Sequence, residues 1–189
     1  MAYKVTVCGS GVKLPEGTES PRARAVGSEL ARRGAELYVG GCWGLSYEAA
    51  VAARKEGAKI TVVSPGRDRG EHMERFDFPD PEQFSETVYF GRFVPPELQR
   101  SDSYCFMARS GAMVAMADKV VALRGTIGTF YEITAGLHED KDVGVLLGED
   151  GWDEYFRGVL ERNELRRRMK KGKVIYEPDP QVLVTRILE

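Results

Sequence analysis

A glycine turn in the second half of the chain combines residue types that hold phosphate. The segment Leu123–Glu132 reads LRGTIGTFYE and follows an apolar, β-branched run. Glycines let the backbone approach a ligand, threonines offer hydroxyls, and the start of a helix presents free N–H groups with partial positive charge. The pattern predicts an anion site formed by Arg124, Gly125, Thr126, Ile127, Gly128 and Thr129.

Glu132 and Arg109 are the charged residues that could act on a ligand held by this turn. A carboxylate in the first helical turn complements the helix dipole or closes a capping box on Thr129, but a phosphate cradle has no use for its negative charge. Arg109 has small neighbours on both sides. It is either an ordinary surface charge or a planar clamp on phosphate or sugar. The residues alone leave both alternatives open.

Two further glycine turns follow strand-like runs earlier in the chain. Cys8–Gly11 follows the first run, and Gly40–Leu45 follows the second and opens a helical pattern. Glycine in such turns serves backbone geometry alone in many proteins, but three turns at one edge of a sheet indicate a ligand site. We expect Trp43 to pack rather than to stack on a base. The additional candidate phosphate or nucleotide contacts are Gly9, Ser10, Gly40 and Gly41.

Short valine-rich runs alternate with helical patterns along the chain. The runs have the composition of strands buried on both faces, and several helical patterns stop at a glycine. This alternation predicts an α/β, Rossmann-like three-layer sandwich with a mostly parallel sheet of about seven strands and helices on both faces, formed by one domain over residues 1–189. The expected strands are Lys4–Cys8, Glu36–Val39, Lys59–Val63, Thr87–Phe90, Lys119–Leu123, Val143–Leu147 and Lys173–Tyr176. The expected helices are Ser20–Arg33, Leu45–Glu56, Pro96–Met116, Thr129–Glu139 and Trp152–Lys171.

Composition narrows the class of partner. The formal net charge is −2, so no basic excess argues for nucleic acid, and we expect a small molecule and no nucleic acid. Three scattered cysteines without a CxxC pair predict neither a disulfide framework nor a zinc site, and we expect no metal and no cofactor. No apolar run is long enough to span a bilayer and no signal peptide is evident, so we expect no membrane contact and a cytoplasmic location.

The segment Pro65–Gln83 is the least regular part of the pattern. It mixes charges with Phe76 and Phe78, and a loop of this length is either a solvated surface loop or a lid over a site. The two histidines, His72 and His138, belong to no nucleophile constellation, and we expect both to lie on the surface.

The chain resembles the Lonely Guy (LOG) phosphoribohydrolases, long labelled lysine decarboxylases, and related Rossmann-like nucleotide-binding or molybdenum-cofactor-binding proteins. The family motif is Pro-Gly-Gly-x-Gly-Thr-x-x-Glu, preceded by Met-x-x-Arg-Lys-x-x-Met and an Asp. Ser110, Arg124 and Thr126 stand where the motif has Lys, Pro and its second Gly. The residues that match in one gapless register are Arg109, Met113, Asp118, Leu123, Gly125, Gly128, Thr129 and Glu132.

The resemblance implies a function for the odd carboxylate. Members of the family cleave the N-glycosidic bond of nucleoside 5′-monophosphates, and the motif's Glu and Arg, here Glu132 and Arg109, are their functional pair. It also implies a homo-oligomer. The alternative is a non-catalytic carrier or sensor that holds a nucleotide or a molybdenum cofactor with the same turn.

Overall fold

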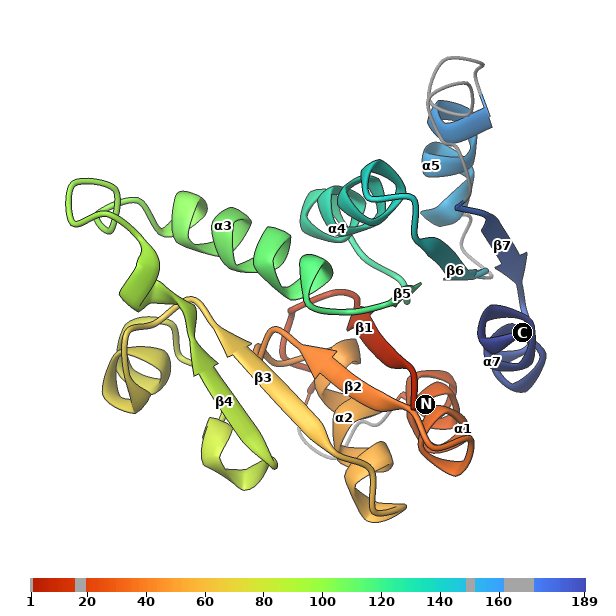
Figure 1. Ribbon diagram of the computed structural model, residues 1–189, viewed down its shortest axis with the longest axis horizontal. Coiled ribbons are helices and arrows are strands. Elements are labelled where there is room, and N and C mark those ends of the chain that lie inside the picture. Colours follow the sequence, from red (N-terminus) through yellow and green to blue (C-terminus); the bar gives the residue numbers. More distant parts are fainter. Residues whose placement is uncertain (1, 16–19, 149–151, 162–171) are drawn as a thin grey trace.

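A seven-stranded parallel sheet forms the centre of the molecule. The computed structural model describes residues 2–15, 20–148, 152–161 and 172–189. Neighbouring strands pair in parallel in the order β4-β3-β2-β1-β5-β6-β7 (Figure 1). The strands are β1 (Lys4–Cys8), β2 (Glu36–Val39), β3 (Ile60–Ser64), β4 (Glu86–Tyr89), β5 (Lys119–Ala122), β6 (Asp142–Leu146) and β7 (Val174–Glu177).

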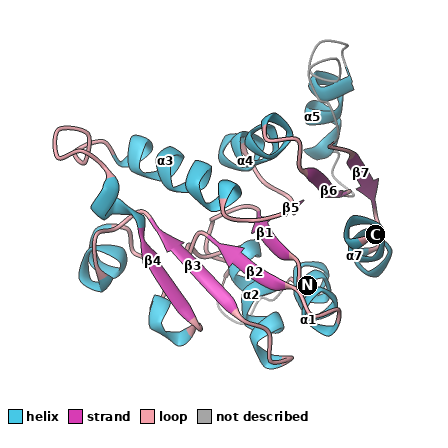
Figure 2. Ribbon diagram, in the orientation of Figure 1, coloured by secondary structure: helices cyan, strands magenta, loops and turns pink. Residues whose placement is uncertain are grey.

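Helices cover both faces of this sheet (Figures 1 and 2). One layer holds α1 (Pro21–Arg32), α2 (Leu45–Lys55) and α7 (Pro180–Leu188), and the other holds α3 (Asp102–Ala115), α4 (Ile127–His138) and α5 (Trp152–Glu161). Three short helical segments, η1 (Glu71–Arg75), η2 (Pro81–Gln83) and η3 (Phe90–Phe93), lie beside β4 in the chain. The predicted three-layer Rossmann-like sandwich is therefore confirmed.

Strand burial explains why the sheet forms in this way. Every residue of β3 is buried, and β1, β2, β5 and β6 each expose at most their first residue. Strands covered on both faces need apolar side chains on both faces, which their valine-rich sequences supply. In the β1–β5 pairing Cys8 is opposite Ala122, so the turns that follow these two strands begin side by side.

Two helices begin two or more residues away from their predicted starts. Helix α3 begins at Asp102 rather than near Pro96, because the Ser101 side chain caps it by accepting a hydrogen bond from the Tyr104 N–H at 3.2 Å. Helix α4 begins two residues earlier than predicted, at Ile127, after Thr126. The predicted helix Trp152–Lys171 is seen as far as Glu161, and its remainder lies outside the described residues.

Helix α7 was not predicted, although its start carries a local signal. Asp179 accepts hydrogen bonds from the N–H groups of Gln181 and Val182 at 2.8 and 2.9 Å, and Pro180 occupies the first helical position. The buried residues of α7, among them Leu183 and Ile187, pack into the same core as α1.

None of the helices in the described ranges is long and apolar enough to cross a membrane. The cytoplasmic location remains a prediction.

Candidate functional site

The three glycine turns meet where the strand order reverses. The chain runs outward from β1 to β4, returns to β5 beside β1, and continues outward to β7. Ligands of open α/β sheets bind at this reversal, outside the carboxyl ends of the strands. The turns bond to one another here: the Ser10 N–H donates to the Arg124 carbonyl at 2.7 Å, and the Leu45 N–H donates to the Ser10 carbonyl at 3.0 Å.

These turns approach one another closely because glycine has no side chain. A Cβ at Gly44, which has φ +89°, would lie 2.0 Å from the Ser10 carbonyl oxygen. A Cβ at Gly9 would lie 3.1 Å from the Cβ of Leu123. Close backbone packing therefore requires glycine at position 44, whereas a side chain at position 9 would press against the side chain of Leu123.

Arg109 is buried, contrary to the ordinary surface alternative. It lies on α3 with 5% of its surface exposed, and its guanidinium rests against the second glycine turn. A Cβ at Gly40 would lie 1.8 Å from Nη1 of Arg109. Its Nε has no hydrogen-bond partner among the described residues, although it is buried. A buried guanidinium nitrogen without an acceptor is energetically costly.

Glu132 is buried beside Arg109. It lies in the second turn of α4 with 7% of its surface exposed, and its Oε1 accepts a hydrogen bond from Ser110 Oγ at 2.8 Å. The Arg109 Nη1 is 3.9 Å from the same oxygen. Since Thr126 precedes the helix and Glu132 lies beyond its first turn, the capping alternative is wrong.

Burial sets the electrostatics of this carboxyl. It raises the pKa of Glu132 above the usual value, while the positive charge of Arg109 and hydrogen bonds from Ser110 and Cys8 act in the opposite direction. The pKa of the Cys8 thiol is itself raised well above its usual value, by burial first and by the negative charge of Glu132 second. The Glu132 carboxyl, whose pKa burial raises, thus lies beside the guanidinium of Arg109.

The start of α4, where the sequence predicts an anion site, borders open space. Thr126 at the N-cap makes no side-chain hydrogen bond to the first amides of α4. A Cβ at Gly128 would meet no atom within 4 Å, whereas a Cβ at Gly125 would lie 1.9 Å from the hydroxyl oxygen of the buried Thr129. The first turn of the helix therefore faces open space at Gly128.

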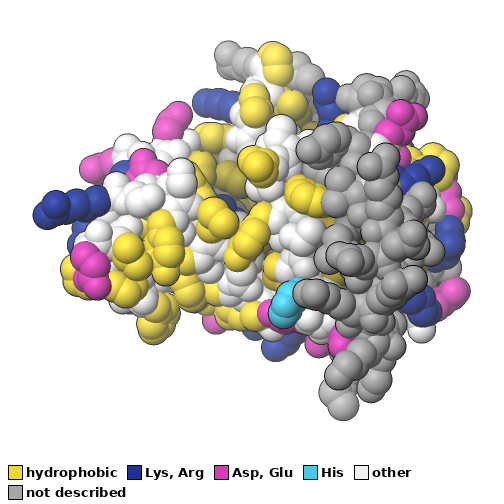
Figure 3. Space-filling model, turned by 90° about the horizontal axis from the view of Figure 1, so that it is seen from above, with side chains coloured by type: hydrophobic (Ala, Val, Ile, Leu, Met, Phe, Trp, Pro, Cys, Tyr) yellow, Lys and Arg dark blue, Asp and Glu magenta, His cyan; other side chains and the backbone are white. Residues whose placement is uncertain are grey.

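A cavity of about 390 Å³ joins these features. The predicted residues that line it are Gly9, Gly40, Arg109, Thr126, Gly128, Thr129 and Glu132. Seen from the α3 and α4 side, the surface shows hydrophobic side chains around a recess (Figure 3). We call this space, lined also by Cys8, Cys42, Ser46, Phe78, Phe106 and Ser110, the acid cavity.

The other predicted contacts lie elsewhere. Ser10, Arg124 and Gly125 line a second cavity on the other side of the third turn, and Thr126 lines both cavities. Gly41, with φ +74°, packs against Val62 and His72, and Ile127 is 85% exposed. The residues predicted to form one site therefore lie in two cavities, and Gly41 and Ile127 line neither of them.

An aromatic wall of the acid cavity was missed by sequence reasoning. Phe78 and Phe106 line the cavity, and their ring centroids are 5.9 Å apart. Phe76 contacts both, at 5.9 Å from Phe78 and 5.2 Å from Phe106. The signal was the phenylalanine pair of the 65–83 segment, but nothing local indicated that helix α3 would meet it.

The 65–83 segment is held against the sheet by His72. This histidine is fully buried, so the predicted surface position is wrong. Its Nδ1 lies 2.7 Å from Ser64 Oγ and its Nε2 lies 3.1 Å from the Pro79 carbonyl oxygen. Burial lowers the pKa of His72 to about 4. The Trp43 indole N–H donates to the Asp77 carbonyl at 2.7 Å, so Trp43 packs on this segment as expected.

The described residues contain no group of three or more His, Cys, Asp or Glu arranged to hold a metal ion.

Comparisons with known proteins agree with this architecture. Residues 2–84 match the model of the SLOG cluster4 family. The structural-genomics target TM1055 is 23% identical with a TM-score of 0.74, and 98% of each chain is covered. The molybdenum cofactor binding protein from Rippkaea orientalis is 19% identical with a TM-score of 0.67, over 100% of this chain and 99% of that one. These findings confirm the family resemblance and the fold. A search of curated proteins finds no match.

One comparison corrects a prediction. DNA processing protein A from Helicobacter pylori, whose structure was described for its single-stranded DNA binding mode, shares the fold at 17% identity and a TM-score of 0.59, over 98% of this chain and 80% of that one. The prediction that excluded nucleic acid is therefore wrong. A net charge of −2 is an average over the whole surface and says nothing about local sites.

Proposed function

We propose that this chain, whose residues 2–84 match the SLOG cluster4 family, binds a nucleoside 5′-monophosphate in the acid cavity and hydrolyses its N-glycosidic bond. The observation that carries the proposal is the buried Arg109 and Glu132 pair, because both residues line the acid cavity and Nη1 of Arg109 lies 3.9 Å from Oε1 of Glu132. The guanidinium of Arg109 suits the oxygen atoms of a ligand, and the carboxylate of Glu132 suits positive charge that develops on the ligand during the reaction.

Phosphate would bind at the start of α4. The amides of Gly128 and Thr129 and the Thr126 hydroxyl surround the open end of the helix, where the dipole favours an anion. Anchoring the phosphate there would place the sugar across the cavity and fix C1′ relative to Glu132.

Glu132 and Arg109 would share the chemistry. Water attacks C1′, the bond from C1′ to the base nitrogen breaks, and the bonding electrons leave with the base. Glu132 stabilises the oxocarbenium-like sugar, takes the proton from water and allows its delivery to the departing base. Arg109 holds a ribose or phosphate oxygen through its guanidinium, and its positive charge opposes the effect of burial on the pKa of Glu132. The products are free base and ribose 5-phosphate.

A panel of ligands tests this proposal. The protein is incubated with adenosine, guanosine, cytidine and uridine 5′-monophosphates, and released base is measured by chromatography with wild type and Glu132→Gln. We expect base release from at least one nucleotide and its loss by a factor of roughly a hundred or more in the variant. Release that survives the substitution removes Glu132 from the mechanism.

The second candidate function is a non-catalytic carrier of a nucleotide or a molybdenum cofactor. Arg124 and Thr126 depart from the hydrolase motif, and both line the second cavity. The solved structures of a molybdenum cofactor binding protein and a molybdenum cofactor carrier protein share the fold of this chain. Tight binding by wild type without base release supports the carrier. Single-stranded DNA belongs in the same binding panel, since a DNA-binding protein shares the fold.

A further inference from the structure

The third glycine turn separates two cavities. The larger has a volume of about 760 Å³ and lies on the α1 and α2 side of residues 123–126, whereas the acid cavity lies on the α3 and α4 side. The backbone of these residues forms the wall between the two cavities, and the hydrogen bond from the Ser10 N–H to the Arg124 carbonyl closes this wall. A molecule in the larger cavity would therefore not reach the Glu132 carboxylate directly.

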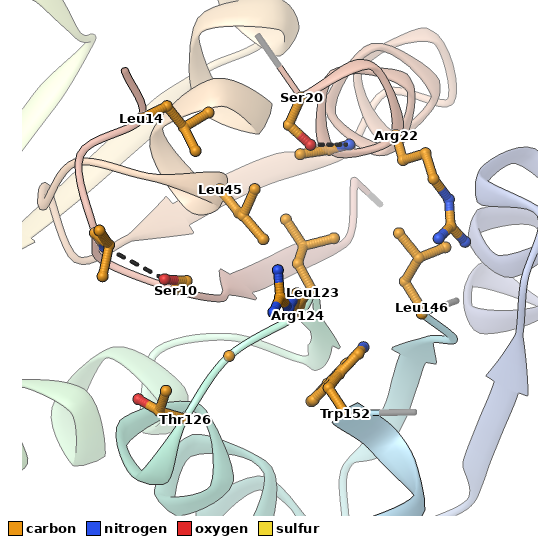
Figure 4. Close-up of a pocket in the computed structure, with 14 residues that line it drawn as sticks. Ser10, Leu14, Ser20, Arg22, Leu45, Leu123, Arg124, Thr126, Leu146 and Trp152 are labelled. Carbon is orange, nitrogen blue, oxygen red and sulfur yellow. Dashed lines mark hydrogen bonds between the residues drawn. The ribbon is translucent and has the colours of Figure 1, made fainter. Parts of the chain in front are cut away.

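The larger cavity has an apolar floor. Leu45, Leu123 and Leu146 converge on it from α2, the end of β5 and β6, and the Trp152 indole closes one side (Figure 4). These side chains supply the apolar surface that typical small-molecule sites use, and the volume falls within the range of roughly 300 to 1,000 Å³ of such sites.

The described part of its rim carries positive charge. Arg22 and Arg124 are the charged residues that line it, and no carboxylate is among the lining residues that the structure describes. Arg22 is held in place by hydrogen bonds from Nη2 to the carbonyl oxygens of Leu147 and Pro178, at 2.7 and 2.5 Å. Ser10, Ser20 and Thr126 add hydroxyl groups around the same space (Figure 4).

We propose that the larger cavity is a second binding site, for an anionic small molecule with an apolar ring system. The rings would lie on the leucine floor beside Trp152, and the anionic group would lie near Arg124. The inference does not depend on hydrolysis in the acid cavity, because no lining residue except Thr126 is common to both cavities.

Anilinonaphthalene sulfonate is a suitable probe, because it joins one sulfonate to aromatic rings and accepts excitation energy from tryptophan. The chain has two tryptophans, Trp43 and Trp152, and only Trp152 lines the cavity. We expect saturable binding with one dye per chain to the folded protein, with energy transfer from both tryptophans and with an affinity that Trp152→Ala lowers and Trp43→Phe leaves unchanged.

Charge variants locate the anionic group. Arg124→Glu, at an exposed position, should weaken dye affinity about tenfold, the size of one hydrogen bond to a charged group. Val12→Glu, at another exposed position of the rim, should weaken it in the same direction. Arg100→Glu makes the same charge change at an exposed residue outside both cavities and should leave affinity unchanged.

Two results would overturn the inference: dye affinity that is equal in wild type, Arg124→Glu and Val12→Glu, or dye affinity that falls in Glu132→Gln as much as in those variants. Failure of base release in the nucleotide panel would leave the dye result intact. The two proposals therefore fail separately.

Discussion

The guanidinium of Arg109 occupies the space that a side chain at position 40 would fill. A Cβ on Gly40 would lie 1.8 Å from Nη1 and 2.6 Å from Cζ of Arg109. Gly40 therefore makes room for an arginine on α3, and the arginine in turn lies 3.9 Å from Glu132 on α4. A turn after β2 thus helps to position a charge pair carried by two neighbouring helices that follow much later in the chain.

Substitution of Gly40 tests this relationship. Gly40→Ala should displace Arg109, lower the free energy of unfolding by about 1 to 3 kcal/mol through overpacking, and weaken adenosine 5′-monophosphate binding. Denaturant unfolding and calorimetric titration measure the two effects. Gly158→Ala, in α5, meets no atom within 4 Å and should leave stability unchanged or slightly raised. Equal behaviour of the two variants would contradict the packing argument.

Removal of the Ser110 hydroxyl should raise the pKa of Glu132. The hydrogen bond from Ser110 stabilises the charged carboxylate and so lowers the pKa of Glu132, whereas burial raises this pKa. Ser110→Ala removes the lowering effect and leaves the effect of burial. NMR titration of the Glu132 carboxyl measures the change without requiring turnover, and any acid limb of base release should move to higher pH with it. Ser103→Ala, at an exposed position of the same helix, is the control. A pKa that falls or stays constant in Ser110→Ala would exclude this role.

Acid should destabilise the fold through His72. Its pKa is about 4 in the folded protein and about 6.5 when unfolded, so the unfolded chain binds more protons between these values. The contribution of His72 to stability is complete above pH 6.5 and should fall by about 3 kcal/mol as the pH drops to 4.

Free energies of unfolding of the wild type and of histidine variants, measured between pH 4 and pH 6.5, isolate the contribution of His72. His72→Gln should have a flatter pH dependence than wild type, even if it is less stable at neutral pH. His138→Asn, at an exposed position, should keep the wild-type dependence. A His72→Gln curve parallel to the wild-type curve would show that other groups cause the acid sensitivity.

The phenylalanine wall should recognise a base rather than a sugar phosphate. Phe78→Leu and Phe106→Leu keep apolar volume but remove the ring face, and stacking on a base contributes about 1 to 3 kcal/mol. We expect roughly tenfold weaker binding of adenosine 5′-monophosphate and unchanged binding of ribose 5-phosphate. Phe93→Leu, at a 72% exposed position outside the cavity, is the control. Equal losses for both ligands would argue against base stacking.

Much of the fold was predictable because its signals are local. Strands β1 and β2 have the predicted bounds, β5 ends one residue early, and β3, β4, β6 and β7 are each shifted by one residue as a whole. Valine-rich runs and helix-ending glycines report on the few residues around them, which a sequence displays directly. The missed helix α7 had such a signal in Asp179 and Pro180, but its short apolar pattern was overlooked.

The sequence by itself determined the alternation of strands and helices, the three glycine turns, and Glu132 and Arg109 as the residues to follow, because each depends on neighbours in the chain. Only the tertiary structure decided that Arg109 is buried on Gly40, that His72 lies inside, and that Phe78 and Phe106 form one wall. It also assigned Arg124 and Glu132 to different cavities. These outcomes depend on how segments far apart in the chain pack at the carboxyl edge of the sheet, and no local pattern encodes that packing.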